Sequence, residues 1–463
     1  MKVELITGST ILESVKNTFK NIDVKDVDTE YFIVVPDRFT LKAEDLLFDT
    51  LGLSSIFNIN IVSLTGLAKQ ILGKENIETI NILDGVMLIQ KAVQNLGDQL
   101  VFYKKSTPTF CYELLKNINQ IKSCMISPEE LLYDGNKEIL KKKVQDIQLI
   151  YREYQRIRGE KKDSSDLIVE CIDNIKSRAC FKDKVLVFAG FDSFTELNYQ
   201  LIKAGMSGAK KLVISLAKPL SLGNEYVYEN DILEKIKKLA SEEDISLEVI
   251  SPQNSLNENQ TILVKNLFNQ SASVEKSSYL SVSSSTSAKE EVQYIASLIK
   301  YRVYRGERFR SFSIGCSDLN RYGKLIERVF TEREIPFYLD SEVNMNSCAL
   351  VVLLSKIFNL KKKNFQNEDL LYLIDSPLLD VENREELAAF VNERNINGRK
   401  GFYSYLKEKL PFVDYIVSKF DSCSVASDYV KTTREILATV QENFEKYLAE
   451  LEDNGLLKER SIE

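Results

Sequence analysis

Short apolar runs recur through the first 250 residues of the chain. Each is five to seven residues long and rich in valine, isoleucine and leucine, and segments of helical apolar spacing separate the runs. A strand buried on both faces gives such a continuous apolar run, whereas a strand with one solvent-exposed face alternates apolar and polar residues. The pattern therefore predicts an α/β fold with a parallel sheet covered by helices on both faces. The predicted strands are residues 3–7, 31–36, 59–63, 184–190, 211–217 and 246–250.

A long stretch without strand patterns lies between the third and fourth runs. Its apolar residues repeat at helical spacing throughout. We interpret residues 76–179 as a helical insertion, so that the first lobe consists of residues 1–75 and 180–255. Tyr151 and Tyr154 are expected to pack inside this insertion. The predicted helices are residues 82–96, 109–124 and 144–158.

The α/β pattern restarts after a polar segment, residues 256–277, which we interpret as a linker. Residues 278–345 then begin a second lobe, and residues 346–463 are predicted to form a helical insertion of that lobe. The second lobe therefore looks incomplete where the sequence ends. The strands predicted for it are residues 278–283, 309–315 and 336–340.

A capping box marks the first helix of the second lobe. Ser287 is followed three residues later by Glu290, the spacing at which each side chain can satisfy the other's backbone N–H. Apolar residues then recur at helical spacing, which predicts a buried stripe. The stripe consists of Val292, Ile295, Ile299 and Val303.

The composition is that of an ordinary soluble protein, with 44% hydrophobic and 28% charged residues. No run approaches the about 18 apolar residues of a membrane span, and Glu4 and Thr7 interrupt any signal-like start. We therefore expect a cytoplasmic protein with no membrane partner. The cysteines are odd in number and lack a C-x-x-C pair, which argues against zinc, an iron–sulfur cluster and a disulfide framework. We expect reduced, mostly buried thiols at positions 111, 124, 171, 180, 316, 348 and 423.

The chain contains no histidine. Ser-His-Asp and Cys-His mechanisms and most catalytic zinc sites need imidazole, so these classes are excluded. With 61 basic and 68 acidic residues the net charge is −7, which gives no bulk attraction for nucleic acid. Any DNA binding must therefore rely on local basic surface.

The first predicted strand runs into Gly8, Ser9 and Thr10, followed by a helix, as in many nucleotide-binding domains. The phosphate-binding pattern G-x-x-x-x-G-K-[ST] fails here: counted from Gly8, its second glycine falls on Glu13, its lysine on Ser14 and its hydroxyl on Val15. We interpret Gly8, Ser9, Thr10 and Glu13 as a degenerate nucleotide site.

The acidic pair that would bind magnesium at the end of a later strand is also missing. Ala189 and Gly190 end the fourth predicted strand, and the lone Asp192 lies beyond it. Asp192 can be a weak magnesium ligand or, more simply, a loop residue ahead of a helix with Thr195 as N-cap. Phe194 and Tyr199 would then form a hydrophobic staple. Tandem RecA-like lobes of the superfamily-one helicase type, without motor chemistry, fit these observations.

Five stretches occur in the order of a known protein family and span roughly residues 1–380. They are "YFIVVPDRFTLKAEDLL", "NINIVSLTGLAKQIL", "VQDIQLIYREYQ", "VLVFAGFDSFTELNYQLI" and "FSIGCSDLNRYGKLIERVFTEREIPFYLD". The chain thereby resembles the AddB (RexB) component of bacterial AddAB (RexAB) helicase–nucleases. The resemblance implies a helicase-like subunit that does not drive translocation. An AddA (RexA) motor subunit would be its partner, single-stranded DNA and double-stranded ends its substrates, and a recombination sequence the object of its scanning.

Members of this family continue into a C-terminal nuclease domain that uses magnesium and a cysteine-bound iron–sulfur cluster. The present sequence ends before such a domain, so we expect neither cofactor nor intrinsic catalysis in this chain. The sequence is then either truncated or a degenerate family member.

The resemblance also implies positions that contact DNA, and each has a structural alternative. Arg38 and Thr40 follow the second strand, but Thr40 also suits a helix N-cap. Leu64 and Lys69 follow the third strand, where the family favours an aromatic residue and a tryptophan, and an arginine in place of Gly66. Leu64, Leu67, Ala68 and Ile71 also fit a core stripe. Phe191 and Phe194 match the family's G-F-x-x-F, and can equally be core residues.

Three basic runs are further candidates for nucleic-acid contact, although charge runs more often form solvated faces. They are Lys141–Lys143 with Arg152, Arg156 and Arg158; Arg302, Arg305, Arg308 and Arg310; and Lys361–Lys363.

Three functions remain open at this point. The favoured one is a non-motor, helicase-like subunit of a double-strand-break processing complex. The second is an inactive scaffold that stabilises a partner helicase and hardly touches DNA, and the third is an ATPase with an unorthodox phosphate loop.

Overall fold

A computed structural model describes residues 2–24, 26–53, 55, 57–73, 79–178, 180–217, 227–252, 257, 260, 280–340, 345 and 348–456. The chain divides into two units, Met1–Ser281 and Val282–Glu463. Apart from Asn257 and Gln260, the predicted linker lies outside the described residues.

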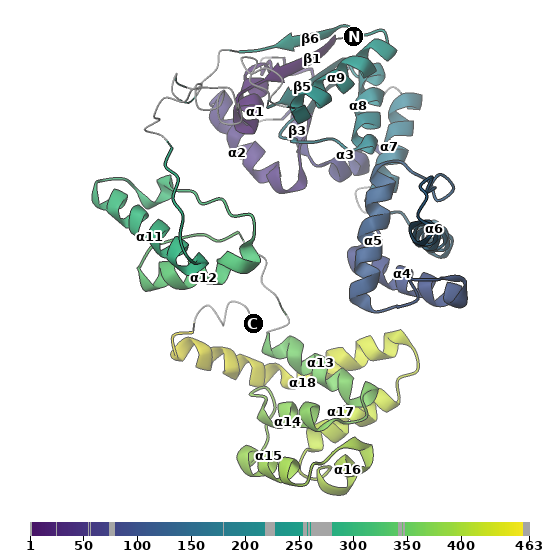
Figure 1. Cartoon of the computed structure of the whole chain (residues 1–463), viewed down its shortest axis with the longest axis vertical. Helices are drawn as coiled ribbons and strands as arrows, with labels where there is room; N and C mark the ends of the chain where they lie inside the picture. The colour runs from purple at the N-terminus through teal and green to yellow at the C-terminus, as the bar shows by residue number, and fades with distance from the viewer. Residues whose placement is uncertain are drawn as a thin grey trace. The chain divides into compact units, whose positions relative to one another are not determined.

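The first unit contains one sheet of six parallel strands (Figure 1). All six predicted strands are present, and the α/β prediction is confirmed for this sheet. The strands lie in the order β3-β2-β4-β5-β1-β6, so β1 pairs with β5 and β6, far from β2. Their bounds are β1 Lys2–Thr7, β2 Tyr31–Val34, β3 Ile59–Val62, β4 Val185–Phe188, β5 Lys211–Leu216 and β6 Leu247–Ile250.

Helices cover both faces of this sheet. One core contains Val15 and Phe19 of α1 with Leu47 of α2, and the other contains Leu67 of α3 and Ile202 of α8. Right-handed crossovers that run in opposite directions along a sheet place their helices on opposite faces, as observed here. The covering helices are α1 (Ile11–Lys20), α2 (Thr40–Leu51), α3 (Leu64–Ile71), α7 (Ser164–Arg178), α8 (Glu196–Gly208) and α9 (Val227–Glu242).

Three further helices, α4 (Ile82–Leu96), α5 (Pro108–Ser123) and α6 (Glu138–Arg158), share a core of their own. Tyr151 and Tyr154 are buried in it, as predicted, and burial raises the pKa of Tyr154 to about 12. By contrast α7, which the prediction placed in the same insertion, contributes to the core beneath the sheet.

The buried carboxylate of Asp146 on α6 fixes the segment that follows α4. It accepts backbone hydrogen bonds from Val101 (3.0 Å), Phe102 (2.7 Å) and Tyr103 (3.0 Å). Three N–H donors replace the water that a buried carboxylate loses, so this charge is satisfied without a cation.

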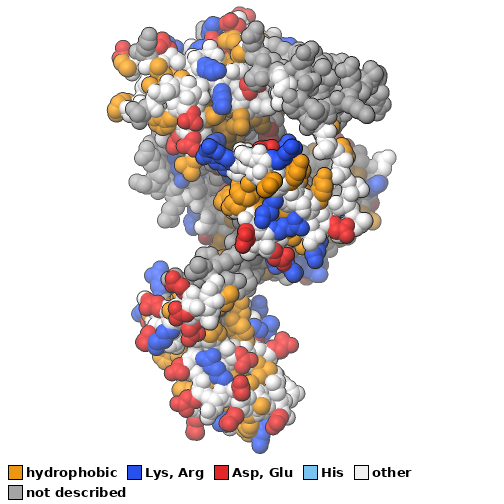
Figure 2. All heavy atoms as spheres, turned by 90° about the vertical axis from the view of Figure 1, so that its left-hand side faces the viewer, with side chains coloured by type: hydrophobic (Ala, Val, Ile, Leu, Met, Phe, Trp, Pro, Cys, Tyr) orange, Lys and Arg blue, Asp and Glu red, His pale blue; other side chains and the backbone are white. Residues whose placement is uncertain are grey.

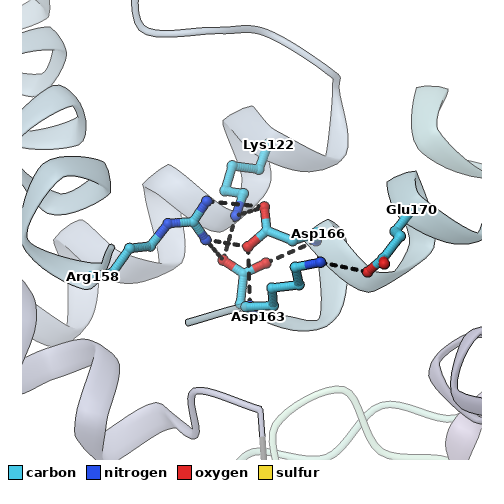
Figure 3. Close-up of polar contacts among 6 residues, drawn as sticks. Lys122, Arg158, Asp163, Asp166 and Glu170 are labelled. Atoms are coloured by element: carbon cyan, nitrogen blue, oxygen red, sulfur yellow. Dashed lines mark hydrogen bonds and ion pairs between the residues drawn. The ribbon is translucent and has the colours of Figure 1, made fainter. Parts of the chain in front are cut away.

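A network of charged side chains connects α5, α6 and α7 (Figure 3). Lys122 of α5 and Arg158 of α6 both bind Asp163 and Asp166, and these four side chains are only 7–20% exposed. Asp163 and Asp166 also accept each other's backbone N–H at 3.1 and 3.0 Å, a capping box at the start of α7. Burial alone raises the pKa of Asp166, but hydrogen bonds from Arg158 and Lys122 outweigh it and hold that pKa well below its usual range.

The second unit begins with the helix pair α11 (Ala288–Tyr304) and α12 (Leu319–Glu332). The Ser287 hydroxyl accepts from the Glu290 N–H at 3.3 Å, which confirms the predicted N-cap. The Glu290 carboxylate, however, accepts from the Thr286 hydroxyl and so leaves the box half formed. Val292 and Ile299 are buried and Ile295 and Val303 half-buried, as the stripe predicted.

The strands predicted at 309–315 and 336–340 are not formed, and the described part of the third, residues 280–283, is no strand either. Phe309–Ser311 is a short 3-10 turn, and the backbone at Phe312 is extended (φ −101°, ψ 138°). An extended segment becomes a strand only when a neighbour supplies ladder hydrogen bonds, and no such pairing exists in the described residues here.

The remaining helices of the second unit, predicted as a helical region, pack around one hydrophobic core. The helices are α13 (Ala349–Lys362), α14 (Asn367–Asp375), α15 (Arg384–Glu393), α16 (Gly398–Tyr405), α17 (Pro411–Asp421) and α18 (Ala426–Asp453).

None of the seven cysteines, all of which are described, forms a disulfide, but fewer are buried than predicted. Cys111, Cys171 and Cys348 are buried, whereas Cys124 is exposed. Burial raises the pKa of Cys171 to about 12, so this thiol is unreactive. In the part of the chain that the structure describes, no helix is both long and apolar enough to cross a membrane.

Candidate nucleic-acid interface at the carboxyl edge of the sheet

The strand order brings together loops that are far apart in the sequence. In a parallel sheet all carboxyl ends lie at one edge, and β3, β2 and β4 are neighbours. The loop after β2 leads to a helix on one face and the loop after β4 to a helix on the other, the arrangement that opens a ligand-binding crevice. The residues predicted to contact DNA all lie on these three loops or the helices that follow them: Arg38, Thr40, Leu64, Lys69, Phe191 and Phe194.

Two of the loops touch at a glycine. Gly190 has φ +80°, a backbone conformation that favours glycine, and a Cβ there would lie 2.8 Å from the ring of Phe39. Phe39 therefore lies against the backbone that follows β4 and holds the β2 and β4 loops together. The contact between Phe39 and Gly190 was not predicted from the sequence, although a glycine directly after a buried strand is a signal of such a close approach.

Arg38 lies in the 3-10 turn Asp37–Phe39 and is exposed. Thr40 is not the N-cap that the sequence suggested: α2 begins at Thr40, and the threonine hydroxyl donates to the Asp37 carbonyl at 3.1 Å. The preceding turn shifts the helix start by one residue, so the cap position falls on Phe39. Phenylalanine has no side-chain acceptor, and the first N–H groups of α2 carry no side-chain cap.

Leu64 and Lys69 lie on α3, where packing explains most of the pattern. Ser63 caps the helix by accepting from the Gly66 N–H at 3.2 Å. Leu67 is fully buried and Leu64 packs partly buried against the same core, so the core stripe is confirmed. Lys69 is half-buried in the last turn.

Phe191 and Phe194 belong to an aromatic cluster with Phe188 beneath the loop. Phe191 is 8% exposed, and its ring centroid lies 5.2 Å from that of Phe194. The predicted staple is confirmed, because Phe194 and Tyr199 lie 5.6 Å apart on either side of the Thr195 N-cap. Both rings therefore face the core in this structure.

The loop after β1 is short, and a carboxylate in the first turn of α1 accepts a hydrogen bond from it. Only Gly8, Ser9 and Thr10 separate β1 from α1. The Ser9 N–H donates to the Glu13 carboxylate at 2.8 Å, and the Thr10 hydroxyl accepts from the Glu13 N–H at 3.1 Å. A carboxylate thus occupies the helix N-terminus at which a phosphate would be expected.

Helix α1 also packs directly on Gly8. A Cβ at Gly8 would lie 2.4 Å from the backbone nitrogen of Ser14, so only glycine fits. The buried Ser14 hydroxyl is hydrogen-bonded to Ser215 at 2.8 Å, and the Asn17 amide donates to the Thr7 carbonyl at 3.1 Å. These bonds hold the start of α1 against the ends of β1 and β5.

Replacing Glu13 by alanine is expected to lower the free energy of unfolding by about 1 kcal/mol, because the Ser9 N–H and the positive end of α1 both lose their carboxylate. Urea unfolding monitored by circular dichroism measures this change. Glu44→Ala is the matched control, since Glu44 is exposed and lies beyond the first turn of α2. Equal losses in the two variants would contradict the assigned role of Glu13.

Asp192 is exposed and accepts from the Ser193 hydroxyl at 3.1 Å. Over the described ranges there is no group of three or more histidine, cysteine, aspartate or glutamate side chains placed to hold a metal ion. One carboxylate without further ligands holds magnesium poorly, so the loop interpretation of Asp192 is the simpler one.

The basic run on α6 is occupied by ion pairs within the protein. Arg152 pairs with Glu129 at 3.2 Å and Arg156 with Glu153 at 2.7 Å, while Arg158 lies in the buried network. Each arginine of this run thus has a carboxylate partner within the protein, so its presence does not require a contact with nucleic acid.

Comparison with known proteins gives a family match over more than half of the chain. The family described as "ADDB, N-terminal" matches residues 8–276. This range includes five of the six strands, β2 to β6, together with the three loops described above, whereas β1 lies just before it.

Curated relatives share one name, that of the B subunit of an ATP-dependent helicase/deoxyribonuclease. The chain is similar to that of Thermoanaerobacter sp. (strain X514), with 23% identity over 396 residues, 80% of this chain and 34% of the relative. It is also similar to that of Alkaliphilus metalliredigens, with 23% identity over 84% of this chain and 36% of the relative. For Caldanaerobacter subterraneus subsp. tengcongensis the identity is 22%, over 92% of this chain and 39% of the relative. The chain thus spans little more than a third of the length of these relatives.

Proposed function

The chain belongs to the AddB N-terminal family, and on that premise we propose that it is the non-motor, helicase-like part of an AddB-type helicase–deoxyribonuclease component that acts in DNA break repair. It binds single-stranded DNA at the carboxyl edge of the sheet and associates with a motor subunit of the AddA type. The second unit begins a second RecA-like lobe in this proposal, and the edge loops scan the strand for a recombination sequence.

The position of the Glu13 carboxylate is the main support for a subunit that is not a motor. It accepts from the Ser9 N–H, and the loop that contains Ser9 has three residues before the helix begins. A phosphate group brought to this helix N-terminus meets a negative charge, and the short loop supplies neither a second glycine nor a lysine to bind it. This arrangement argues against ATP hydrolysis by this chain.

The loop after β2 supports contact with a phosphate backbone. Arg38 is exposed next to the first turn of α2, whose N–H groups carry no side-chain cap. A guanidinium beside a helix N-terminus combines a full positive charge with directed donors, which suits a phosphate. Arg38 is therefore the main proposed contact to the phosphate backbone. Thr40 at the start of α2 and Lys69 in the last turn of α3 are the other proposed contacts. The inward-facing Phe191 and Phe194 support the loop rather than stacking on a base.

Replacing Arg38 by alanine is expected to weaken binding to single-stranded DNA about fivefold, because one phosphate contact is lost. Fluorescence anisotropy of a labelled oligothymidylate at several salt concentrations measures both affinity and salt slope. The slope should fall by about 0.7, the value for one phosphate contact on a single strand.

Lys20→Ala is the matched control for this experiment. Lys20 is exposed at the end of α1, at the opposite edge of the sheet, so the variant removes one charge without touching the loops. Equal weakening in both variants would point to bulk charge instead of an Arg38 contact. An intact chain with no detectable affinity at low salt would favour the scaffold function. ATP turnover that is abolished by Ser9→Ala or Thr10→Ala would favour the unorthodox ATPase.

A further inference from the structure

Helix α11 carries apolar side chains on two opposite faces. Val292, Ala296 and Ile299 are buried in the core shared with α12. Two residues further on from each of these, Tyr294, Leu298 and Tyr301 form a second stripe that is 42–56% exposed. Two residues on a helix correspond to a turn of about 200°, so the second stripe faces away from the core.

The C-terminal end of this helix is strongly basic. Residues 300–310 contain five basic residues and one acidic residue, a net charge of +4 in a chain whose total is −7. Glu307 pairs with Arg302 at 3.3 Å. Within the described residues no carboxylate pairs with Arg305, Arg308 or Arg310, and all three side chains are exposed. In Figure 2 basic and hydrophobic side chains lie side by side on the helix pair.

Tyrosine rings and arginines share one face at this end. Tyr301, Tyr304 and Arg305 lie at i, i+3 and i+4, the spacing of neighbours on a helix surface. The Arg305 guanidinium lies 5.4 Å from the centre of the Tyr301 ring, and Tyr304 is 91% exposed. The turn that follows is fixed by backbone bonds from Gly306 to Val303 at 2.9 Å and from Glu307 to Arg302 at 3.2 Å.

We propose that Tyr301, Tyr304, Arg305 and Arg308 form a platform that binds single-stranded DNA at a second site, apart from the sheet edge. This inference rests on the proposed function and extends it to the second unit. Bases stack on the tyrosine rings, and the arginines bind the flanking phosphates. Tyr301 and Tyr304 are about 4.5 Å apart along the helix axis, a separation that two successive nucleotides can follow.

The charge favours a nucleic acid over a protein as the occupant. A local charge of +4 with exposed aromatic rings is the combination by which proteins bind single strands without reading sequence. The acidic residues Glu290 and Glu291 lie at the other end of the helix, beside Tyr294. The platform is therefore confined to the C-terminal end, while Tyr294 provides an internal comparison.

The test uses the whole chain and a fluorescent oligothymidylate. The double variant Tyr304→Ala/Arg305→Ala is expected to bind about tenfold more weakly and to lose about 0.7 from the salt slope, because one stacked base and one phosphate contact are removed. Tyr294→Ala, on the same stripe but beside the acidic residues, is expected to keep the affinity of the unaltered chain. Circular dichroism melting checks that all variants fold.

The outcomes separate this inference from the proposed function. If Arg38→Ala weakens binding and the double variant does not, the platform is overturned, the proposed function stands, and the stripe is assigned to a protein partner. If Tyr294→Ala loses as much affinity as the double variant, the platform is also overturned, since the effect belongs to the whole helix. If the unaltered chain binds no oligonucleotide, the proposed function fails and the platform fails with it.

Discussion

Replacing Asp166 by alanine is expected to lower the free energy of unfolding of the first unit by about 3–5 kcal/mol. Asp166 binds Arg158 and accepts from the Lys122 ammonium at 2.9 Å, and both cations are almost completely buried. Without Asp166, two buried positive charges share the single carboxylate of Asp163. Removal of one partner from a buried ion pair leaves a charge that neither water nor protein compensates. The variant also loses half of the capping box that starts α7.

Urea unfolding of the full chain measures this loss, and hydrogen exchange of the α5, α6 and α7 amides locates it. Glu113→Ala is the matched control, because Glu113 pairs with Lys116 on the surface of α5 with both side chains 57% exposed. Exposed pairs of this kind contribute at most about 1 kcal/mol. A loss in Asp166→Ala no larger than in Glu113→Ala would contradict a stabilising role of the network.

The pH dependence of stability gives a second readout of the same network. The pKa of Asp166 is lower in the folded chain than its ordinary value, so the folded state favours the ionised form. Its contribution is complete above the pKa of an unfolded aspartate, about 4, and is lost as the pH falls below that value. The difference in stability between the unaltered chain and Asp166→Ala should therefore shrink as the pH is lowered from 5 towards 3.

Replacing Gly8 by alanine is expected to lower the free energy of unfolding by about 3 kcal/mol, the upper end for an overpacked site. The new Cβ would lie 2.4 Å from the backbone nitrogen and 2.7 Å from the Cα of Ser14. Backbone atoms cannot rotate away as a side chain can, so α1 has to move from the end of β1. Such a movement strains the bonds from Ser14 to Ser215 and from Asn17 to Thr7.

Gly66→Ala is the control for this substitution. A Cβ at Gly66 meets its nearest atoms at 3.5 and 3.6 Å, which is ordinary contact, and alanine suits a helix better than glycine. Urea unfolding of the two variants should therefore give a large loss for Gly8→Ala and none for Gly66→Ala. Similar stabilities would show that α1 adjusts freely at this loop.

Part of the candidate site could be predicted from the sequence because it depends on neighbours along the chain. The apolar runs predicted the strands, and Thr195 and Ser287 were placed correctly as N-caps, since a cap bonds to a residue three positions away. Thr40 shows the limit of this reasoning. A threonine before an apolar helix suits the cap position, but the turn at Asp37–Phe39 moved the helix start onto it.

The apolar runs were enough to predict the six strands of the first unit. Which of these segments lie next to one another became clear only from the folded chain. The strand order places the loops of Arg38, Leu64 and Phe191 at neighbouring strands, and burial turned Phe191 towards the core. The ion pair between Lys122 and Asp163 likewise joins residues 41 positions apart in the sequence. Local hydrogen bonds and apolar spacing depend on residues close together in the chain, whereas strand pairing and buried ion pairs depend on contacts that no short stretch of sequence specifies.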